Sequence, residues 1–287
     1  MNKKVGFTML VTLKEMADRA AAEAYAVPAF NIFGYEDIAP VVQAAEAMNA
    51  PVILAANLVA VKHMPVPYLA PLMLRAAREA SVPVCVHLDH GKDLAACVEA
   101  IEHGFSSVMY DGSQLPLEDN IRRTKEIADY AHAHGVSVEA EIGSVGYSDP
   151  SIAMKHMLSD PDEVDVFVRE TGIDAVAISV GTVHRMESQA ASIDFDLLQR
   201  IQDRVGIPLV IHGSSGVPDD QLRRLTTYRV AKINIGTALR MAFGRTLRDE
   251  LERKPKEFDR IALFQQPMEA VREAALAKFA LLGFDTK

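Results

Sequence analysis

The chain has 287 residues, of which 49% are hydrophobic, so it can bury one large core. Its 39 acidic residues outnumber its 30 Lys and Arg residues, and the net charge of -9 argues against nucleic acid or an acidic membrane as a partner. Only Cys85 and Cys97 are present, and the N-terminal stretch lacks the long apolar segment of a signal peptide, so we expect a cytoplasmic protein.

Short apolar runs alternate with amphipathic stretches along the whole chain. The apolar runs predict strands at 26–31, 51–56, 82–89, 105–111, 135–141, 174–181, 207–212 and 229–236. Helical periodicity predicts helices at 11–24, 37–49, 68–80, 92–103, 117–134, 161–171, 195–205, 218–226, 239–253 and 265–282. This alternation predicts one α/β domain over 1–287, a (β/α)8 TIM barrel with extra C-terminal helices. A doubly wound open sheet is the alternative, although no Gly-x-Gly-x-x-Gly motif follows the first strand.

Polar residues gather at the carboxyl ends of the predicted strands. They are Asn31, Asp89, His90, Asp111, Glu141, His184, His212 and Asn234. A single polar residue at such a position could simply mark the end of a buried strand. A set that includes three histidines favours an active site, because barrel enzymes place their active sites on this face.

Three of these residues, His90, His184 and His212, follow three different strands. Three neutral imidazoles without a nearby cysteine are typical of a catalytic zinc site with an open fourth position. Such an ion can polarise a carbonyl group and stabilise an enediolate. Asp89 lies beside a predicted ligand and is well placed as a general acid or base. His87 lies inside the third strand, where we expect it to be buried or to orient a neighbour.

Two glycine-containing turns, HGSSG after the seventh strand and NIGT after the eighth, predict a phosphate site. The loops after strands seven and eight bind phosphate in many barrels. Glycine lets backbone N–H groups approach phosphate oxygens, and Ser214, Ser215 and Thr237 offer hydroxyl groups. A metal and a phosphate site on one face predict chemistry on a phosphorylated carbonyl compound.

The segment AEIGSVGYSDPS at 140–151 runs from the fifth strand into a polar loop. It fits either an ordinary surface loop or a mobile lid that carries a catalytic carboxylate. Asp149 is the acidic residue near its tip.

Taken in order, seven motifs resemble the class II (zinc-dependent) ketose-bisphosphate aldolases, closest to the fructose-bisphosphate and tagatose-bisphosphate branch. They are VPAFNI, HLDHG, MYDGS, VEAEIG, VGTVH, HGSSGVPD and KINIGT, which together span essentially residues 12–245. The resemblance implies reversible cleavage of a ketose 1-phosphate or ketose 1,6-bisphosphate to dihydroxyacetone phosphate and an aldehyde. We also expect a homodimer or homotetramer.

The resemblance also implies roles for individual residues. His90, His184 and His212 would bind the catalytic zinc, and Asp89 would give a proton to the aldehyde oxygen. Asp111 and Glu141 would hold a second, or shifted, divalent ion. The residues expected to bind substrate are Asn31, Arg185, Gly213, Ser214, Ser215, Asn234, Ile235, Gly236 and Thr237.

The chain departs from the family pattern at three places. The family's lid reads Gly-Gly followed by acidic residues, whereas Gly146 here is followed by Tyr-Ser and then Asp149, the candidate base. The glycine that lies against the phosphate and a monovalent cation in the family is Arg185 here. A Ser/Thr-x-Gly turn after the second strand is replaced by residues 57–59, Asn-Leu-Val. These changes predict an aldehyde other than glyceraldehyde 3-phosphate, with a non-phosphorylated, carboxylated or sulfonated tail.

Three other functions stay open at this point. A Schiff-base aldolase would need a reactive lysine, and Lys232 in the eighth strand is the best candidate. Zinc hydrolases of this fold often begin with a metal-binding His-x-His on the first strand, which AVPAFNI lacks. A non-catalytic scaffold could keep the fold but would not need the three histidines together with Asp89.

Overall fold

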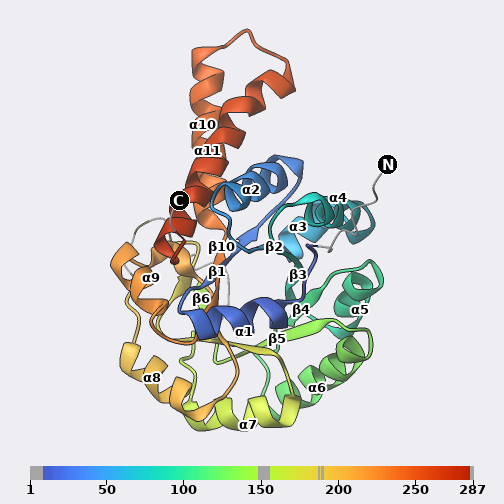
Figure 1. Ribbon diagram of the computed structural model, residues 1–287, viewed down its shortest axis with the longest axis vertical. Coiled ribbons are helices and arrows are strands. Elements are labelled where there is room, and N and C mark those ends of the chain that lie inside the picture. The colour runs from blue at the N-terminus through green and yellow to red at the C-terminus, as the bar shows by residue number, and fades with distance from the viewer. Residues whose placement is uncertain (1–8, 148–155, 187, 189–190, 285–287) are drawn as a thin grey trace.

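Eight parallel strands close into a barrel in the computed structural model, which describes residues 9–147, 156–186, 188 and 191–284 (Figure 1). Around the barrel the strand order is β1-β10-β9-β7-β5-β4-β3-β2. The bounds are β1 (Val27–Asn31), β2 (Val52–Asn57), β3 (Val84–Gly91), β4 (Ser107–Tyr110), β5 (Ser137–Ile142), β7 (Ala175–Ile178), β9 (Leu209–Ile211) and β10 (Val230–Ile235). The predicted TIM barrel is confirmed, and closure of the sheet excludes the open, doubly wound alternative.

Helices surround the barrel because the outer face of its strands is apolar and must be covered. The bounds are α2 (Tyr35–Ala47), α3 (Leu58–His63), α4 (Val66–Glu79), α5 (Leu94–Glu102), α6 (Leu117–Ala133), α7 (Pro161–Thr171), α8 (Phe195–Arg204), α9 (Asp219–Leu225), α10 (Thr237–Arg253) and α11 (Arg260–Leu281). Helix α3 was not expected. It begins because the Asn57 side chain accepts the N–H groups of Val59 and Ala60, at 3.1 and 3.0 Å.

The N-terminal helix α1 (Leu13–Glu23) closes one end of the barrel. Thr12 and Glu15 form a capping box that starts the helix. The fully buried Leu13 belongs to a core cluster that also contains inward-facing strand residues such as Val27 and Ile53. Because this amino end is filled with apolar side chains, the carboxyl ends of the strands are left to form a site.

The sixth barrel strand is shorter than the predicted 174–181. β7 ends at Ile178, and the chain then turns at Gly181, whose φ of 107° favours glycine. His184 lies on a separate short strand, β8 (Val183–His184), which pairs with β6 (Gly146–Tyr147). A short 3-10 helix, η1 (Ser214–Gly216), follows β9 and contacts β8. These additions lie beside the open end of the barrel.

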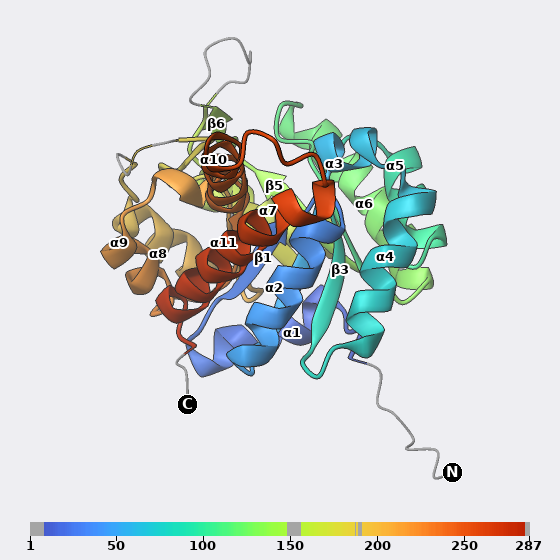
Figure 2. The ribbon, with the colours of Figure 1, turned by 90° about the horizontal axis from the view of Figure 1, so that it is seen from above.

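The last two helices, α10 and α11, pack against each other and project from the barrel as a hairpin (Figures 1 and 2). Helix α11 also packs against α2, which anchors the hairpin to the barrel. No helix in the described part of the chain is long and apolar enough to span a membrane.

Candidate active site

The three predicted zinc ligands meet at the carboxyl end of the barrel. His90 comes from β3, His184 from β8, and His212 directly follows β9. One nitrogen from each imidazole lies within 4.8 Å of the others. Nδ1 of His212 is 3.0 Å from Nε2 of His90, so these two atoms face the space that an ion would take. The structure therefore brings together three residues that are far apart in the sequence, in an arrangement that fits a tetrahedral ion with an open position.

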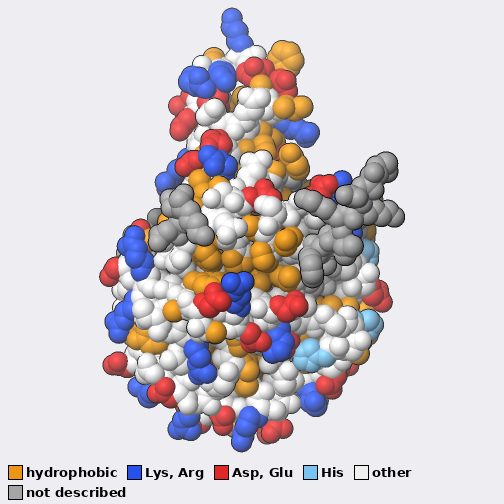
Figure 3. Space-filling view, viewed as in Figure 1, with side chains coloured by type: hydrophobic (Ala, Val, Ile, Leu, Met, Phe, Trp, Pro, Cys, Tyr) orange, Lys and Arg blue, Asp and Glu red, His pale blue; other side chains and the backbone are white. Residues whose placement is uncertain are grey.

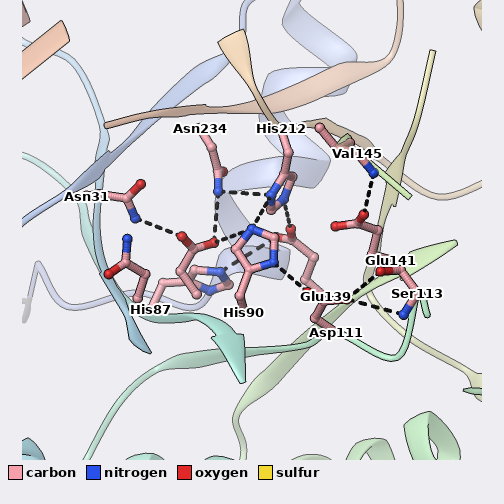
Figure 4. A network of polar contacts seen from close by, with 12 residues as sticks. Asn31, His87, His90, Asp111, Ser113, Glu139, Glu141, Val145, His212 and Asn234 are labelled. Carbon is pink, nitrogen blue, oxygen red and sulfur yellow. Dashed lines mark hydrogen bonds and ion pairs between the residues drawn. The ribbon is translucent and has the colours of Figure 1, made fainter. Parts of the chain in front are cut away.

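The other ring nitrogens of two of these histidines contact buried carboxylates (Figure 4). Nδ1 of His90 is 2.9 Å from Oδ2 of Asp111, and Nε2 of His212 is 2.8 Å from Oε1 of Glu139. A carboxylate at the far nitrogen holds the ring proton there and leaves the near nitrogen as a lone-pair donor. The residue types and the contacts on both rings thus fit a divalent metal.

Glu139 is a site residue that the sequence reasoning missed. Its carboxylate is fully buried inside the barrel, where Oε2 lies 2.8 Å from Nζ of Lys232 and 3.7 Å from Nε2 of His87. The signal that could have found it is the charged residue within the otherwise apolar strand SVEAEI, two positions before Glu141 on the same side of the strand. A buried charge of this kind needs a partner, here Lys232.

Lys232 does not suit the Schiff-base alternative. Its side chain is fully buried and ion-paired with Glu139, and it does not line the pocket described below. A nucleophilic lysine must reach the substrate carbonyl. This placement favours the metal-dependent reaction over the Schiff-base one.

Asp89 lies at the end of β3 with its side chain held by two asparagines. Oδ2 accepts from Nδ2 of Asn31 at 2.7 Å, and Oδ1 accepts from Nδ2 of Asn234 at 2.8 Å. Burial alone would raise its pKa, but the nearby His90, His212 and Lys232 hold the pKa of Asp89 well below its usual range. Asp89 is therefore an oriented, ionised carboxylate next to the three-histidine cluster.

The protonation of the three histidines differs because their neighbours differ. Burial and the neighbouring imidazoles lower the pKa of His184, and burial lowers that of His212, so both rings stay neutral and able to bind metal. Burial also acts against charge on His90, but Asp89 and Asp111 outweigh it and raise the pKa of His90 to about 9. Metal binding at His90 must therefore displace a proton.

Asp111 and Glu141 lie beside the histidines, where His90, Asp111 and Glu141 form a second group with ligand atoms within 4.8 Å. Oε1 of Glu141 accepts the N–H of Val145 at 3.1 Å. Burial and the charge of Asp111 raise the pKa of Glu141 to about 8. Lys92, which the sequence reasoning did not single out, forms an ion pair with Asp111.

One pocket opens above these residues. Its wall includes Asn31, Asp89, His90, Asp111, His184, Arg185, Gly213, Ser214, Ser215, Asn234, Gly236 and Thr237, all predicted site residues. The wall also contains Asn57, Leu58 and Val59, and three residues not expected there: Phe33, Lys92 and Arg240. Three further predicted site residues are buried and do not line the wall: Glu141, His212 and Ile235. Asp149 lies outside the described residues.

The glycines of the two predicted phosphate turns are needed for close packing. Gly213 has φ 70°, and a Cβ there would lie 2.8 Å from the carbonyl carbon of Val183. At Gly236 a Cβ would lie 2.8 Å from Oδ1 of Asn31. Thr237 begins the 17-residue helix α10, so a helix N-terminus faces the pocket next to these turns. Backbone N–H groups at such an end favour an anion.

Comparison with known proteins shows the family. The family model described as fructose-bisphosphate aldolase class-II matches residues 11–287. The fructose-bisphosphate aldolase of Geobacillus stearothermophilus is 36% identical over 282 residues, covering 97% of this chain and 98% of the relative. The 6-phospho-5-dehydro-2-deoxy-D-gluconate aldolase of Bacillus subtilis (strain 168) is 37% identical over 276 residues, covering 95% of each.

Among solved structures, the YdjI aldolase from Escherichia coli K12 superposes with a TM-score of 0.84 at 32% identity, covering 96% of this chain and 98% of that one. A fructose-1,6-bisphosphate aldolase described as putative, from Coccidioides immitis, also gives a TM-score of 0.84, at 26% identity, covering 94% and 95% of the two chains. With its closed barrel and its cluster of histidines and carboxylates at the strand ends, the chain belongs to the class II fructose-bisphosphate aldolase family, whose members are lyases.

Proposed function

We propose that the protein is a zinc-dependent aldolase that reversibly cleaves a ketose 1-phosphate or ketose 1,6-bisphosphate to dihydroxyacetone phosphate and an aldehyde. The observation that carries this proposal is one pocket lined by His90, His184, the oriented Asp89 and the turns at Gly213 and Gly236. His212 is buried beside it and completes the three-histidine cluster. Zinc held by the three imidazoles would polarise the substrate carbonyl and stabilise the negative charge that develops on it.

The chain's own groups divide the remaining work. The turn after β9 and the N-terminus of α10 supply N–H and hydroxyl groups for the phosphate. Asn31 and Asn234 hold the carboxylate of Asp89, which we assign to proton transfer at the aldehyde oxygen. For the base that removes the α-proton, Asp149 remains the candidate.

The test of the metal site is replacement of His90, His184 or His212 by Ala, one at a time. Each change should weaken zinc binding and reduce carbon–carbon cleavage nearly to zero, because the reacting carbonyl loses its Lewis acid. His103→Ala is the control, since that half-buried side chain does not line the pocket and its Nδ1 contacts the carbonyl of Glu99 in its own helix. A variant that lacks one of these three histidines but keeps full zinc content and full turnover would overturn the assignment.

We propose further that the preferred aldehyde differs from glyceraldehyde 3-phosphate in its tail. The relatives show that substrate varies at this level of identity, since their names include two different aldolase substrates. Arg185 has φ 58°, a conformation that favours glycine, and its side chain lines the pocket wall. Arg185 and Arg240 also line an adjoining groove with Arg245 and Arg248. An arginine fork suits a carboxylate or sulfonate as well as a phosphate.

The deciding measurement is kcat/KM for fructose and tagatose bisphosphates against a panel of ketose 1-phosphates with uncharged, carboxylated and sulfonated tails. We expect a non-bisphosphate substrate to be cleaved best. Arg185→Gly should move the preference toward bisphosphates, because it removes the fork and relieves the backbone. Bisphosphate values at or above roughly 10⁴ M⁻¹s⁻¹, with weaker cleavage of every other substrate, would refute the specificity but not the aldolase chemistry.

A further inference from the structure

We propose that the ammonium group of Lys92 takes the place of a second divalent cation, so that the protein holds one divalent ion per chain. The inference rests on the proposed metal site of His90, His184 and His212, and concerns the neighbouring group of His90, Asp111 and Glu141. That group has the residue types and the spacing of a cation site, but one cation of the chain itself already contacts it.

The contacts of Asp111 leave little room for another ligand bond. Oδ2 contacts Nδ1 of His90 at 2.9 Å and is ion-paired with Nζ of Lys92. Oδ1 accepts both the N–H of Ser113, at 3.2 Å, and its hydroxyl, at 2.7 Å. Because each oxygen already has two donors, a divalent ion could bind Asp111 only by displacing one of them.

Lys92 reaches this carboxylate from the pocket. It follows the end of β3 directly, and its side chain is 46% exposed, whereas that of Asp111 is 1% exposed. The ammonium therefore neutralises a buried carboxylate from the solvent side, between that carboxylate and the substrate space. A divalent ion bound beside it would be repelled by the positive charge.

Glu141 supplies the second observation. Its Oε2 atom is buried and has no hydrogen-bond partner among the described residues. With Lys92 present, that oxygen is left without a cation of its own. If Lys92 were removed, Oδ2 of Asp111 would keep only its contact with Nδ1 of His90. Together with Oε2 of Glu141 it would then offer a pair of oxygens suited to a divalent ion.

The arrangement also serves the three-histidine site. A second ion bound to Nδ1 of His90 would displace the hydrogen bond that this atom makes with Asp111. Lys92 instead stabilises Asp111 as an acceptor, so that His90 presents Nε2 toward His212. The lysine is thus a positioning residue for one metal ligand, acting through Asp111.

The test starts from metal-free protein, dialyses it to equilibrium against Co²⁺ and counts the ions bound per chain. Wild type and the charge-retaining control Lys92→Arg should each bind about one ion. Lys92→Ala should bind about two, and Lys92→Ala/Glu141→Gln should return to about one, because the second site loses a ligand charge. Thermal melts followed by circular dichroism check that each variant is folded.

A single ion in Lys92→Ala would overturn the inference and leave the proposed function intact. Two ions bound to wild type, one of which is lost in Glu141→Gln, would also overturn the inference and leave the proposed function intact. Absence of any bound cobalt in wild type would overturn both the inference and the proposed zinc chemistry.

Discussion

At the scale of single residues, the site depends on carboxylates that orient its histidines. Glu139 is the clearest case, because it joins the ring of His212 to the buried charge of Lys232. Glutamine in its place can still accept a hydrogen bond but lacks the charge that pairs with Lys232. Such supporting groups typically contribute 10- to 100-fold in metal affinity.

We therefore expect Glu139→Gln to weaken zinc binding by about 10- to 100-fold, measured by competition with a chelator. It should also lower the midpoint of thermal unfolding, since Lys232 is left as an unpaired buried charge. The exposed Glu99→Gln is the matched control. Equal zinc affinity in wild type and Glu139→Gln would contradict the orienting role.

Asp89 leads to a second prediction at this scale. Asp89→Ala should keep its zinc and still exchange the α-proton of dihydroxyacetone phosphate with solvent deuterium. Cleavage of the ketose should fall by at least about 10²-fold, because no positioned group is left to exchange a proton with the aldehyde oxygen. Comparing the exchange rate with the cleavage rate tests this. Equal losses in both would show that Asp89 acts earlier in the reaction.

At the scale of elements, the turn after β9 shows why a loop can require glycine. Gly213 and Gly172 have nearly the same φ, 70° and 68°, but only Gly213 is surrounded by other backbone. A Cβ at Gly213 would contact Val183 and His184, whereas one at Gly172 meets nothing within 4 Å.

Gly213→Ala should therefore reduce kcat/KM by more than about 10-fold, because the turn and β8 must shift and carry His184 with them. Gly172→Ala should cost only about 1 kcal/mol of stability from the left-handed backbone and leave kcat/KM unchanged. Steady-state kinetics and urea unfolding of both variants check the pair. A loss of activity in Gly172→Ala, or unchanged activity in Gly213→Ala, would argue against the packing explanation.

Helix α2 carries a pH-dependent element near its N-terminus. Asp37 accepts the N–H of Phe33 at 2.8 Å, and burial raises the pKa of Asp37 to about 6. A carboxyl whose folded pKa is raised contributes stability below its unfolded pKa and loses it as pH rises through the folded value. As the pH rises from roughly 4 to 7, wild type should therefore lose about 2 kcal/mol of unfolding free energy relative to Asp37→Asn. Urea unfolding at both pH values tests this, and a difference that stays constant with pH would contradict it.

At the scale of the whole molecule, the α10–α11 hairpin projects away from the barrel with apolar side chains on it (Figures 1 and 3). Phe258 is 92% exposed and Ile261 is 71% exposed. We expect a second copy of the chain to cover them in a homodimer or homotetramer, because isolated apolar side chains gain free energy when buried.

Replacing both Phe258 and Ile261 by Ser should reduce the mass of the assembly in light scattering coupled to size-exclusion chromatography. Thermal unfolding of the barrel should change little, since neither side chain packs in its core. Tyr68→Ser is the control, because Tyr68 is equally exposed, at 71%, but lies on α4. A monomeric wild type would contradict the expectation.

The amino-acid sequence by itself determined the barrel and the convergence of its three histidines. Strand and helix periods are local properties, and the helix at 161–171 was predicted with its observed bounds. Parallel strands bring all their carboxyl ends to one face, so His90 and His212 could be placed together without a structure. The family motifs then supplied the expected reaction.

Only the tertiary structure decided which charges meet inside the barrel. Glu139 on β5 and Lys232 on β10 are 93 residues apart and on strands that are not neighbours, so no local pattern relates them. The pairing of Lys92 with Asp111 and the transfer of His184 to β8 were hidden for the same reason. The free energy of a buried charge depends on partners that folding brings near, and neither the period of a strand nor the spacing of a motif contains that information.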